Sequence, residues 1–163
     1  MLNSCAYETR LFHIVLFAPE IPPNTGNISR LAVSCNCALH LIKPLGFSLD
    51  EKELKRAGLD YWQYLDLSLY ENFAEFLSKN ENSRIFPVTK FGTKKIWEHT
   101  YRAGDYFLFG NETGGLPDSI HSLDIFSGKK LFLPMPGISR SLNLSNCAAV
   151  VIYEGLRQLE SRS

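Results

Sequence analysis

The order of apolar and amphipathic stretches constrains the fold of this chain more than any other feature. Apolar residues at helical spacing mark residues 28–35 and 70–79, and a final amphipathic helix begins near Leu142. Short runs rich in β-branched and aromatic residues alternate with these stretches, at residues 12–18, 39–42, 84–88, 105–109 and 130–133. Strands separated by helices pair in parallel, because each helix returns the chain to the same end of the sheet. The sequence therefore predicts an α/β fold with a mostly parallel sheet and helices on both faces.

Length and residue content limit the classes of protein to which the chain could belong. A chain of 163 residues is long enough for one compact domain and short for two, so we expect a single domain over residues 1–163. It has no apolar run long enough to span a membrane and no apolar stretch typical of a signal peptide, which favours a cytoplasmic protein. The four cysteines and four histidines lack the spacing of a zinc site, so we expect no metal.

The net charge argues against a general nucleic-acid binder. Seventeen Lys and Arg residues balance seventeen Asp and Glu residues, whereas such binders need an excess of positive charge to neutralise phosphates. Local clusters could still contact a few phosphates, although each is also compatible with an ordinary solvated face. These clusters are Lys52, Lys55 and Arg56; Lys90, Lys94 and Lys95; and Lys129 and Lys130 with Arg140.

Three polar segments follow predicted strands and are the richest in groups that can position a ligand. They are residues 24–30, 110–117 and 134–146. In open parallel sheets, ligands bind beyond the carboxyl ends of the strands, where loops and helix N-termini converge. We therefore expect the functional site to be built from these three segments.

The segment at residues 110–117 is rich in glycine but matches no common phosphate-binding motif. Glu112 breaks the dinucleotide pattern G-x-G-x-x-G, and Leu116 stands where a P-loop needs lysine. A carboxylate here disfavours an anionic ligand and suits a ribose hydroxyl or a cationic group. The alternative is a plain glycine-rich turn, after which Pro117 starts a short helix.

The other two segments each open a helix. Five short polar side chains surround the start of the last helix, where one cap needs only one of them: Ser139, Ser141, Asn143, Ser145 and Asn146. In the segment 24–30, Asn24 or Thr25 can cap the first helix, and Arg30 follows one to two turns later. Each segment alone has a structural explanation, as a cap or a solvated helix.

Read together, the three segments resemble those of the SPOUT superfamily of α/β-knot methyltransferases. They are most similar to its YibK-like, TrmL-type branch, the tRNA wobble-nucleotide 2′-O-methyltransferases. The matching stretches are Ile-Pro-Pro-Asn-Thr-Gly-Asn-Ile-Ser-Arg at 21–30, Phe-Gly-Asn-Glu-Thr-Gly-Gly-Leu-Pro at 109–117, Leu-Pro-Met followed by Ser-Arg-Ser-Leu-Asn-Leu-Ser-Asn within 133–146, and Lys-Arg-Ala-Gly-Leu-Asp-Tyr at 55–61. The similarity extends from about His13 to Leu159, which leaves residues 1–12 as an extension plus the start of the first strand.

The resemblance implies a C-terminal deep trefoil knot, although connection rules disfavour knots in general. It implies S-adenosylmethionine as cofactor, with S-adenosylhomocysteine as product and no metal. By matching motif positions, cofactor contacts would come from Val88, Gly110, Leu133, Met135, Ser141 and Asn143. It further implies a homodimer that binds tRNA with both chains and methylates the ribose of a wobble C or U.

The resemblance also assigns catalytic roles. It places Arg30 beside the ribose hydroxyl. A guanidinium is a poor proton acceptor near neutral pH, so we expect Arg30 to orient a phosphate and stabilise developing negative charge. Asn24 would position Arg30 or the ribose, and Glu112 would fix the loop or assist removal of the proton.

Two alternatives and one departure remain. The same chemistry could act on ribosomal RNA, or the chain could be a non-catalytic RNA-binding protein that senses S-adenosylmethionine. A nucleotide-dependent oxidoreductase is disfavoured because the glycine fingerprint is absent. Gly114 stands where many relatives carry arginine, which leaves one cation fewer for RNA.

Overall fold

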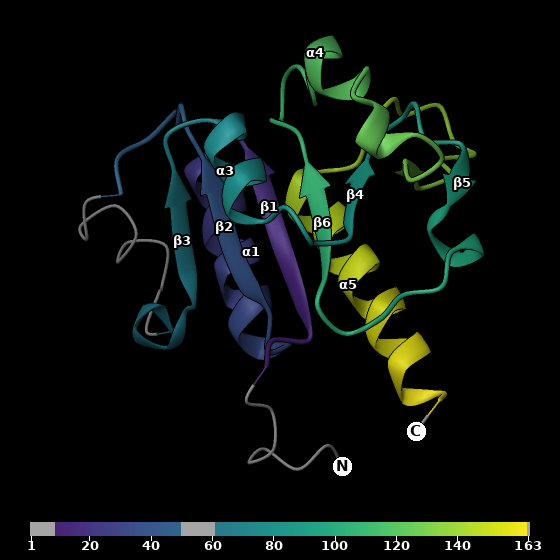
Figure 1. Ribbon diagram of the computed structural model, residues 1–163, viewed down its shortest axis with the longest axis horizontal. Coiled ribbons are helices and arrows are strands. Elements are labelled where there is room, and N and C mark those ends of the chain that lie inside the picture. The colour runs from purple at the N-terminus through teal and green to yellow at the C-terminus, as the bar shows by residue number, and fades with distance from the viewer. Residues whose placement is uncertain (1–8, 50–60, 163) are drawn as a thin grey trace.

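The structure of the protein is a computed structural model that describes residues 9–49 and 61–162. In this part of the chain, seven strands form one sheet in the order β3-β2-β1-β6-β4-β7-β5, and neighbouring strands pair in parallel (Figure 1). The strands are β1 (Phe12–Phe17), β2 (Ala38–Ile42), β3 (Leu67–Tyr70), β4 (Ile85–Val88), β5 (Lys94–Lys95), β6 (Asp105–Phe109) and β7 (Leu131–Phe132). The predicted parallel α/β sheet is confirmed.

Two long helices, α1 (Pro22–Ser34) and α5 (Leu144–Glu160), lie side by side on one face of the sheet (Figure 1). Pro22 and Pro23 suit the start of α1, because the first N–H groups of a helix have no intrahelical acceptor. The apolar sides of both helices pack against the central strands. The buried residues of this core include Phe12, Ile14, Leu16, Ile28, Ala32, Leu39, Phe107, Ala148, Val151 and Ile152.

The opposite face carries short helices over a second core. α3 (Phe73–Lys79), α4 (Asp118–His121) and a 3₁₀ turn at Asp124–Phe126 cover it. Phe76 is fully buried there against the sheet, with Val15 and Leu108 beneath it. Helices therefore occupy both faces, as the sequence predicts.

The structure corrects some predicted boundaries. Residues 70–79 are not one helix, because Tyr70 ends strand β3 and α3 begins only at Phe73, after Asn72 caps it by accepting from the Glu75 amide. Neither Asn24 nor Thr25 caps α1: its N-cap is Ile21, and both polar residues are buried within the helix. The last helix begins at Leu144, two residues later than predicted.

The last strand of the sheet lies between two strands that precede it in the sequence. β7 pairs with β4 on one side and with β5 on the other. The turn that joins β4 to β5 crosses over β7, and its Thr89 amide donates to the Leu131 carbonyl at 2.9 Å. A Cβ atom on Gly92 would lie 2.4 Å from the Leu131 carbonyl carbon, so this close crossing requires glycine.

A chain of hydrogen-bonded rings lies under α3, away from the polar segments. Nδ1 of His13 lies 2.8 Å from Nε2 of His40, whose Nδ1 lies 3.0 Å from the Tyr70 hydroxyl. The ring of Tyr106 stacks on His13 at 3.9 Å. Burial lowers the pKa of both histidines to about 4. Both rings are therefore neutral near pH 7.

Stability should fall in mild acid because of these histidines. Their pKa values are lower in the folded chain than the ~6.5 of an unfolded histidine, so the unfolded state takes up protons first as the pH falls. The stabilisation is complete above about pH 6.5 and is lost toward pH 4. Titration of His40 alone should lower the free energy of unfolding by about 2 kcal/mol between pH 7.5 and pH 5.

Urea denaturation at the two pH values measures this loss. His40→Gln removes one titrating ring and should make the pH dependence shallower, whatever its own stability at pH 7.5. An identical pH dependence in the variant and the original protein would assign the acid sensitivity to other groups.

Candidate functional site

The three polar segments meet at the carboxyl edge of the sheet, around one pocket of about 530 Å³. β1, β6 and β7 all end at this edge, so the residues that follow them converge although they are far apart in the sequence. Eight of the nine site residues expected from the sequence line the pocket. They are Asn24, Val88, Gly110, Glu112, Leu133, Met135, Ser141 and Asn143.

The Glu112 carboxylate joins the loop after β6 to the start of α1. Its Oε2 accepts from the Glu20 amide at 2.8 Å, and its Oε1 accepts from the Ile21 amide and from Asn24 Nδ2, both at 3.1 Å. The two amides lie at the open N-terminal end of α1, where a negative charge is favoured by the helix dipole. Three donors therefore hold the carboxylate and fix the loop against the helix.

Asn143 adds the third segment to this network. Its Nδ2 donates to Asn24 Oδ1 at 2.9 Å, which links residues 119 positions apart. Its Oδ1 accepts from the Ser145 amide at 2.9 Å and also from the Asn146 amide, so the same side chain caps α5. The Asn143 side chain thus caps α5 and also connects the start of this helix to α1.

The glycine-rich loop folds back on itself beside the pocket. The Asn111 amide and the Gly115 carbonyl pair at 3.3 Å, and the Gly115 amide donates to the Asn111 carbonyl at 3.0 Å. A Cβ atom on Gly110 would lie 2.0 Å from the Gly115 carbonyl carbon, so only glycine fits at 110. Gly115 has a positive φ of 71°, a conformation that glycine adopts without strain. The glycines therefore shape a tight backbone wall of the pocket.

Arg30 is the one expected site residue that does not line the pocket. It lies near the end of α1 with an exposed side chain, and its guanidinium stacks 5.3 Å from the centre of the Tyr61 ring. Arg30 follows Asn24 by six positions in the helix, and this spacing corresponds to about 9 Å along the helix axis. The structure therefore places Arg30 on the surface and not among the walls of the pocket.

The charges in the pocket are few. Among the described residues, Lys90, Glu112 and Arg140 are the Lys, Arg, Asp or Glu side chains that line it. Burial lowers the pKa of His121, so this pocket residue is neutral near pH 7, and burial raises the pKa of Cys147 to about 11, which keeps its thiol protonated. The pocket is therefore lined by one carboxylate and two cations, and its thiol is not ionised.

Sequence reasoning missed several lining residues. Thr89 and Phe91 line the pocket from the turn after β4, on either side of Lys90 from the predicted basic cluster, and His121 lines it from α4. The turn after β4 also follows a strand, so its position alone could have identified it as a candidate part of the site. It lacks the dense polar pattern of the other three segments. Of the basic clusters, Lys90 and Arg140 reach the pocket, while Lys52, Lys55 and Arg56 lie outside the described residues.

Within residues 9–49 and 61–162, no group of three His, Cys, Asp or Glu side chains is arranged to hold a metal ion. In the same part of the chain, none of the helices is both long and apolar enough to cross a membrane.

Comparisons with known proteins agree on one family. Residues 11–153 match the model of the SpoU rRNA Methylase family. The tRNA (cytidine(34)-2'-O)-methyltransferase of Yersinia pestis is 48% identical, over 91% of this chain and 94% of that protein. The enzyme of the same name from Escherichia coli K12 is 46% identical, also over 91% and 94%.

Solved structures give the same result. One, described as giving structural insights into the 2-OH methylation of C/U34 on tRNA, superposes with a TM-score of 0.86 at 45% identity, covering 94% of this chain and 99% of the other. The SpoU methyltransferase AviRb from Streptomyces viridochromogenes in complex with AdoMet shares the fold, with a TM-score of 0.82 at 22% identity, over 99% of this chain and 65% of that one.

Proposed function

Because this chain belongs to the SpoU rRNA Methylase family, we propose that it transfers a methyl group from S-adenosylmethionine to the 2′-hydroxyl of C or U at position 34 of tRNA. The observation that carries the proposal is the identity of 46–48% to enzymes of that name over nearly the full length of both chains. Residues 1–163 would act as a single methyltransferase domain. We further propose a cytoplasmic location, which is compatible with a tRNA substrate.

The pocket fits the proposed cofactor. Its volume of about 530 Å³ lies within the range typical of small-molecule sites. Val88, Leu133 and Met135 offer an apolar surface for the adenine, with the Gly110 backbone beside it. Ser141 and Asn143 offer hydrogen-bonding groups for the polar parts of the molecule. When bound, S-adenosylmethionine supplies an electrophilic methyl group and leaves as S-adenosylhomocysteine.

The residues of the site divide the remaining tasks. Arg30 orients a phosphate of the RNA and stabilises the negative charge that develops on the ribose oxygen, because a guanidinium stays protonated and cannot act as a base. Asn24 lines the pocket from α1, where Glu112 and Asn143 hold its amide, and positions the ribose. Glu112 already accepts from three N–H donors, which supports a role in holding Asn24 and the loop rather than in removing a proton.

We also propose the deep trefoil knot that is typical of SPOUT proteins. The position of β7 supports it, because this late strand lies between β4 and β5 while the turn joining those strands crosses over it. In the proposed knot, the chain that continues from β7 into α5 passes beneath a segment that precedes it. Such threading is rare among protein folds.

We propose a homodimer that packs on the outer surface of α5. Val150 is 44% exposed and Tyr153 is 59% exposed on this helix, so it presents apolar area that a second copy of the chain would cover. Val150→Glu should convert a particle of twice the 18.5 kDa chain mass into a monomer, as measured by light scattering. Glu160→Lys at the end of the same helix is the control and should leave the mass unchanged; a dimeric Val150→Glu variant would place the interface elsewhere.

Labelling of RNA tests the function. The purified protein is incubated with methyl-labelled S-adenosylmethionine and total RNA from cells that lack the gene, and the labelled nucleoside is mapped. We expect a 2′-O-methyl group at position 34 of tRNA. Label in ribosomal RNA would show that the substrate is ribosomal RNA instead of tRNA. Absence of label from all RNA would favour a non-catalytic protein that senses S-adenosylmethionine.

A further inference from the structure

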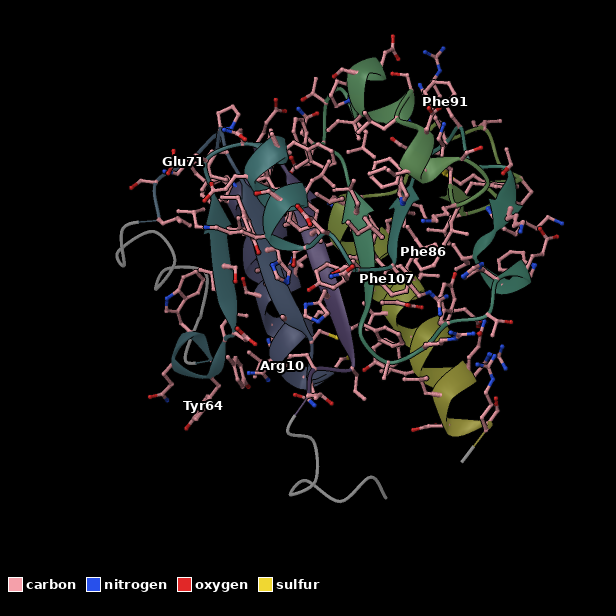
Figure 2. All side chains as sticks on the ribbon, in the orientation of Figure 1. Arg10, Tyr64, Glu71, Phe86, Phe91 and Phe107 are labelled. Carbon is pink, nitrogen blue, oxygen red and sulfur yellow. The ribbon has the colours of Figure 1, made fainter. Side chains whose placement is uncertain are left out.

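An exposed aromatic side chain stands at the edge of the cofactor pocket. Phe91 lines the pocket, yet 61% of its surface is exposed, and it lies beside α4 in Figure 2. The apolar residues proposed to enclose the cofactor are much less exposed, as with Val88 at 8%. Most of the Phe91 ring is thus available to a second ligand that approaches from outside.

Hydrogen bonds hold the backbone at Phe91, although its side chain is exposed. The Phe91 amide donates to Thr89 Oγ1 at 3.3 Å, and the Gly92 amide donates to the Thr89 carbonyl at 3.1 Å. The close crossing of Gly92 over Leu131 anchors the turn to β7. Because the turn is already held in place, it loses little conformational entropy when a ligand stacks on the ring.

The surroundings of Phe91 suit an RNA base and its phosphate. His121 and Phe91 pack edge-to-face, with ring centres 5.3 Å apart, while 61% of the Phe91 surface stays exposed. The exposed Lys90 side chain lies over the Phe91 ring, with its ammonium 5.0 Å from the ring centre, and Arg140 lines the same pocket. Gly114, which also lines the pocket, adds no side chain to obstruct this approach. An aromatic face beside two cations is the combination with which proteins bind single-stranded nucleic acid.

We propose that Phe91 is a substrate-binding residue on which an unpaired base of the RNA loop stacks beside the pocket, while Lys90 binds the adjacent phosphate. The inference rests on the proposed RNA methyltransferase activity and names a contact by which that substrate is held. Stacking on an aromatic ring is tolerant of base identity, so this contact would add affinity rather than select a tRNA.

The test compares variants that keep or remove the ring. Phe91→Leu should raise the KM for a tRNA anticodon stem-loop about 5- to 100-fold, leave kcat within about two-fold, and leave the Kd for S-adenosylhomocysteine unchanged. Phe91→Trp should retain the low KM. Trp97→Leu is the matched control, since Trp97 is 52% exposed but does not line the pocket. A stem-loop with 2-aminopurine in the loop should lose fluorescence on binding, and Phe91→Leu should reduce this quenching.

The outcomes separate this inference from the proposed function. If the original protein methylates the stem-loop and Phe91→Leu has the same KM and the same quenching, the stacking role is wrong while the function stands. If Phe91→Leu weakens binding of S-adenosylhomocysteine alone, the ring stacks on the cofactor and the proposal is also wrong. If the original protein methylates no RNA, the proposed function fails first, independently of Phe91.

Discussion

Arg30→Ala is expected to lower kcat for methyl transfer by about 100-fold or more while the Kd for S-adenosylmethionine stays unchanged. The cofactor affinity should persist because Arg30 does not line the pocket. The loss in kcat should follow because no other described cation is proposed to stabilise charge at the ribose oxygen. Single-turnover methylation of an anticodon stem-loop measures the first quantity, and titration calorimetry measures the second.

Two further variants sharpen this prediction. Arg30→Lys keeps a positive charge but loses the planar donor fork and its stacking on Tyr61, so it should recover only part of the rate. Arg102→Ala removes an exposed arginine from another part of the surface and should leave the rate unchanged. If Arg30→Ala binds the cofactor normally and methylates at the original rate, the catalytic role assigned to Arg30 is wrong.

Glu112→Gln is expected to weaken cofactor binding at least about ten-fold and to lower the free energy of unfolding by about 1–2 kcal/mol. The carboxylate uses both oxygens to accept from Glu20, Ile21 and Asn24. A glutamine has only one such oxygen, so its NH₂ group must face at least one donor. The start of α1 would then separate from the loop after β6, and Asn24 would lose its fixed position in the pocket.

Calorimetry with S-adenosylhomocysteine and urea denaturation measure these two effects. Glu81→Gln provides the matched control, because it neutralises an exposed carboxylate outside this pocket and should change neither quantity. Normal binding and normal stability of Glu112→Gln would show that the hydrogen bonds of the carboxylate do not hold the site together.

The sequence predicts the central sheet well because its strands carry strong apolar signals. The strand expected at residues 105–109 coincides with β6, and the expected layers of helices are present. β3 was not predicted, because Tyr70 shares a helical spacing with the apolar residues of α3, whereas its strand structure depends on pairing with Ile42. β5 consists of two lysines and is defined only by pairing with β7, so no local pattern reveals it.

The site is predictable in its segments but not in its connections. The sequence singles out Asn24, Glu112 and Asn143, but nothing in it reveals that their side chains bond to one another across 88 and 119 positions. Those bonds arise from the parallel sheet, which brings distant loops to one edge. The same limit applies to Phe91, which becomes noteworthy only when the turn after β4 is seen to reach the pocket.

The position of β7 between β4 and β5 has a consequence for the timing of activity. The pocket needs residues from the first helix and residues that follow the last strand, so its walls come from both ends of the chain. During synthesis, the segment from residue 134 onward leaves the ribosome near the end, and contacts between such distant parts form slowly. A nascent chain therefore has no complete pocket, and an activity that depends on this pocket arises only after α5 has emerged and docked.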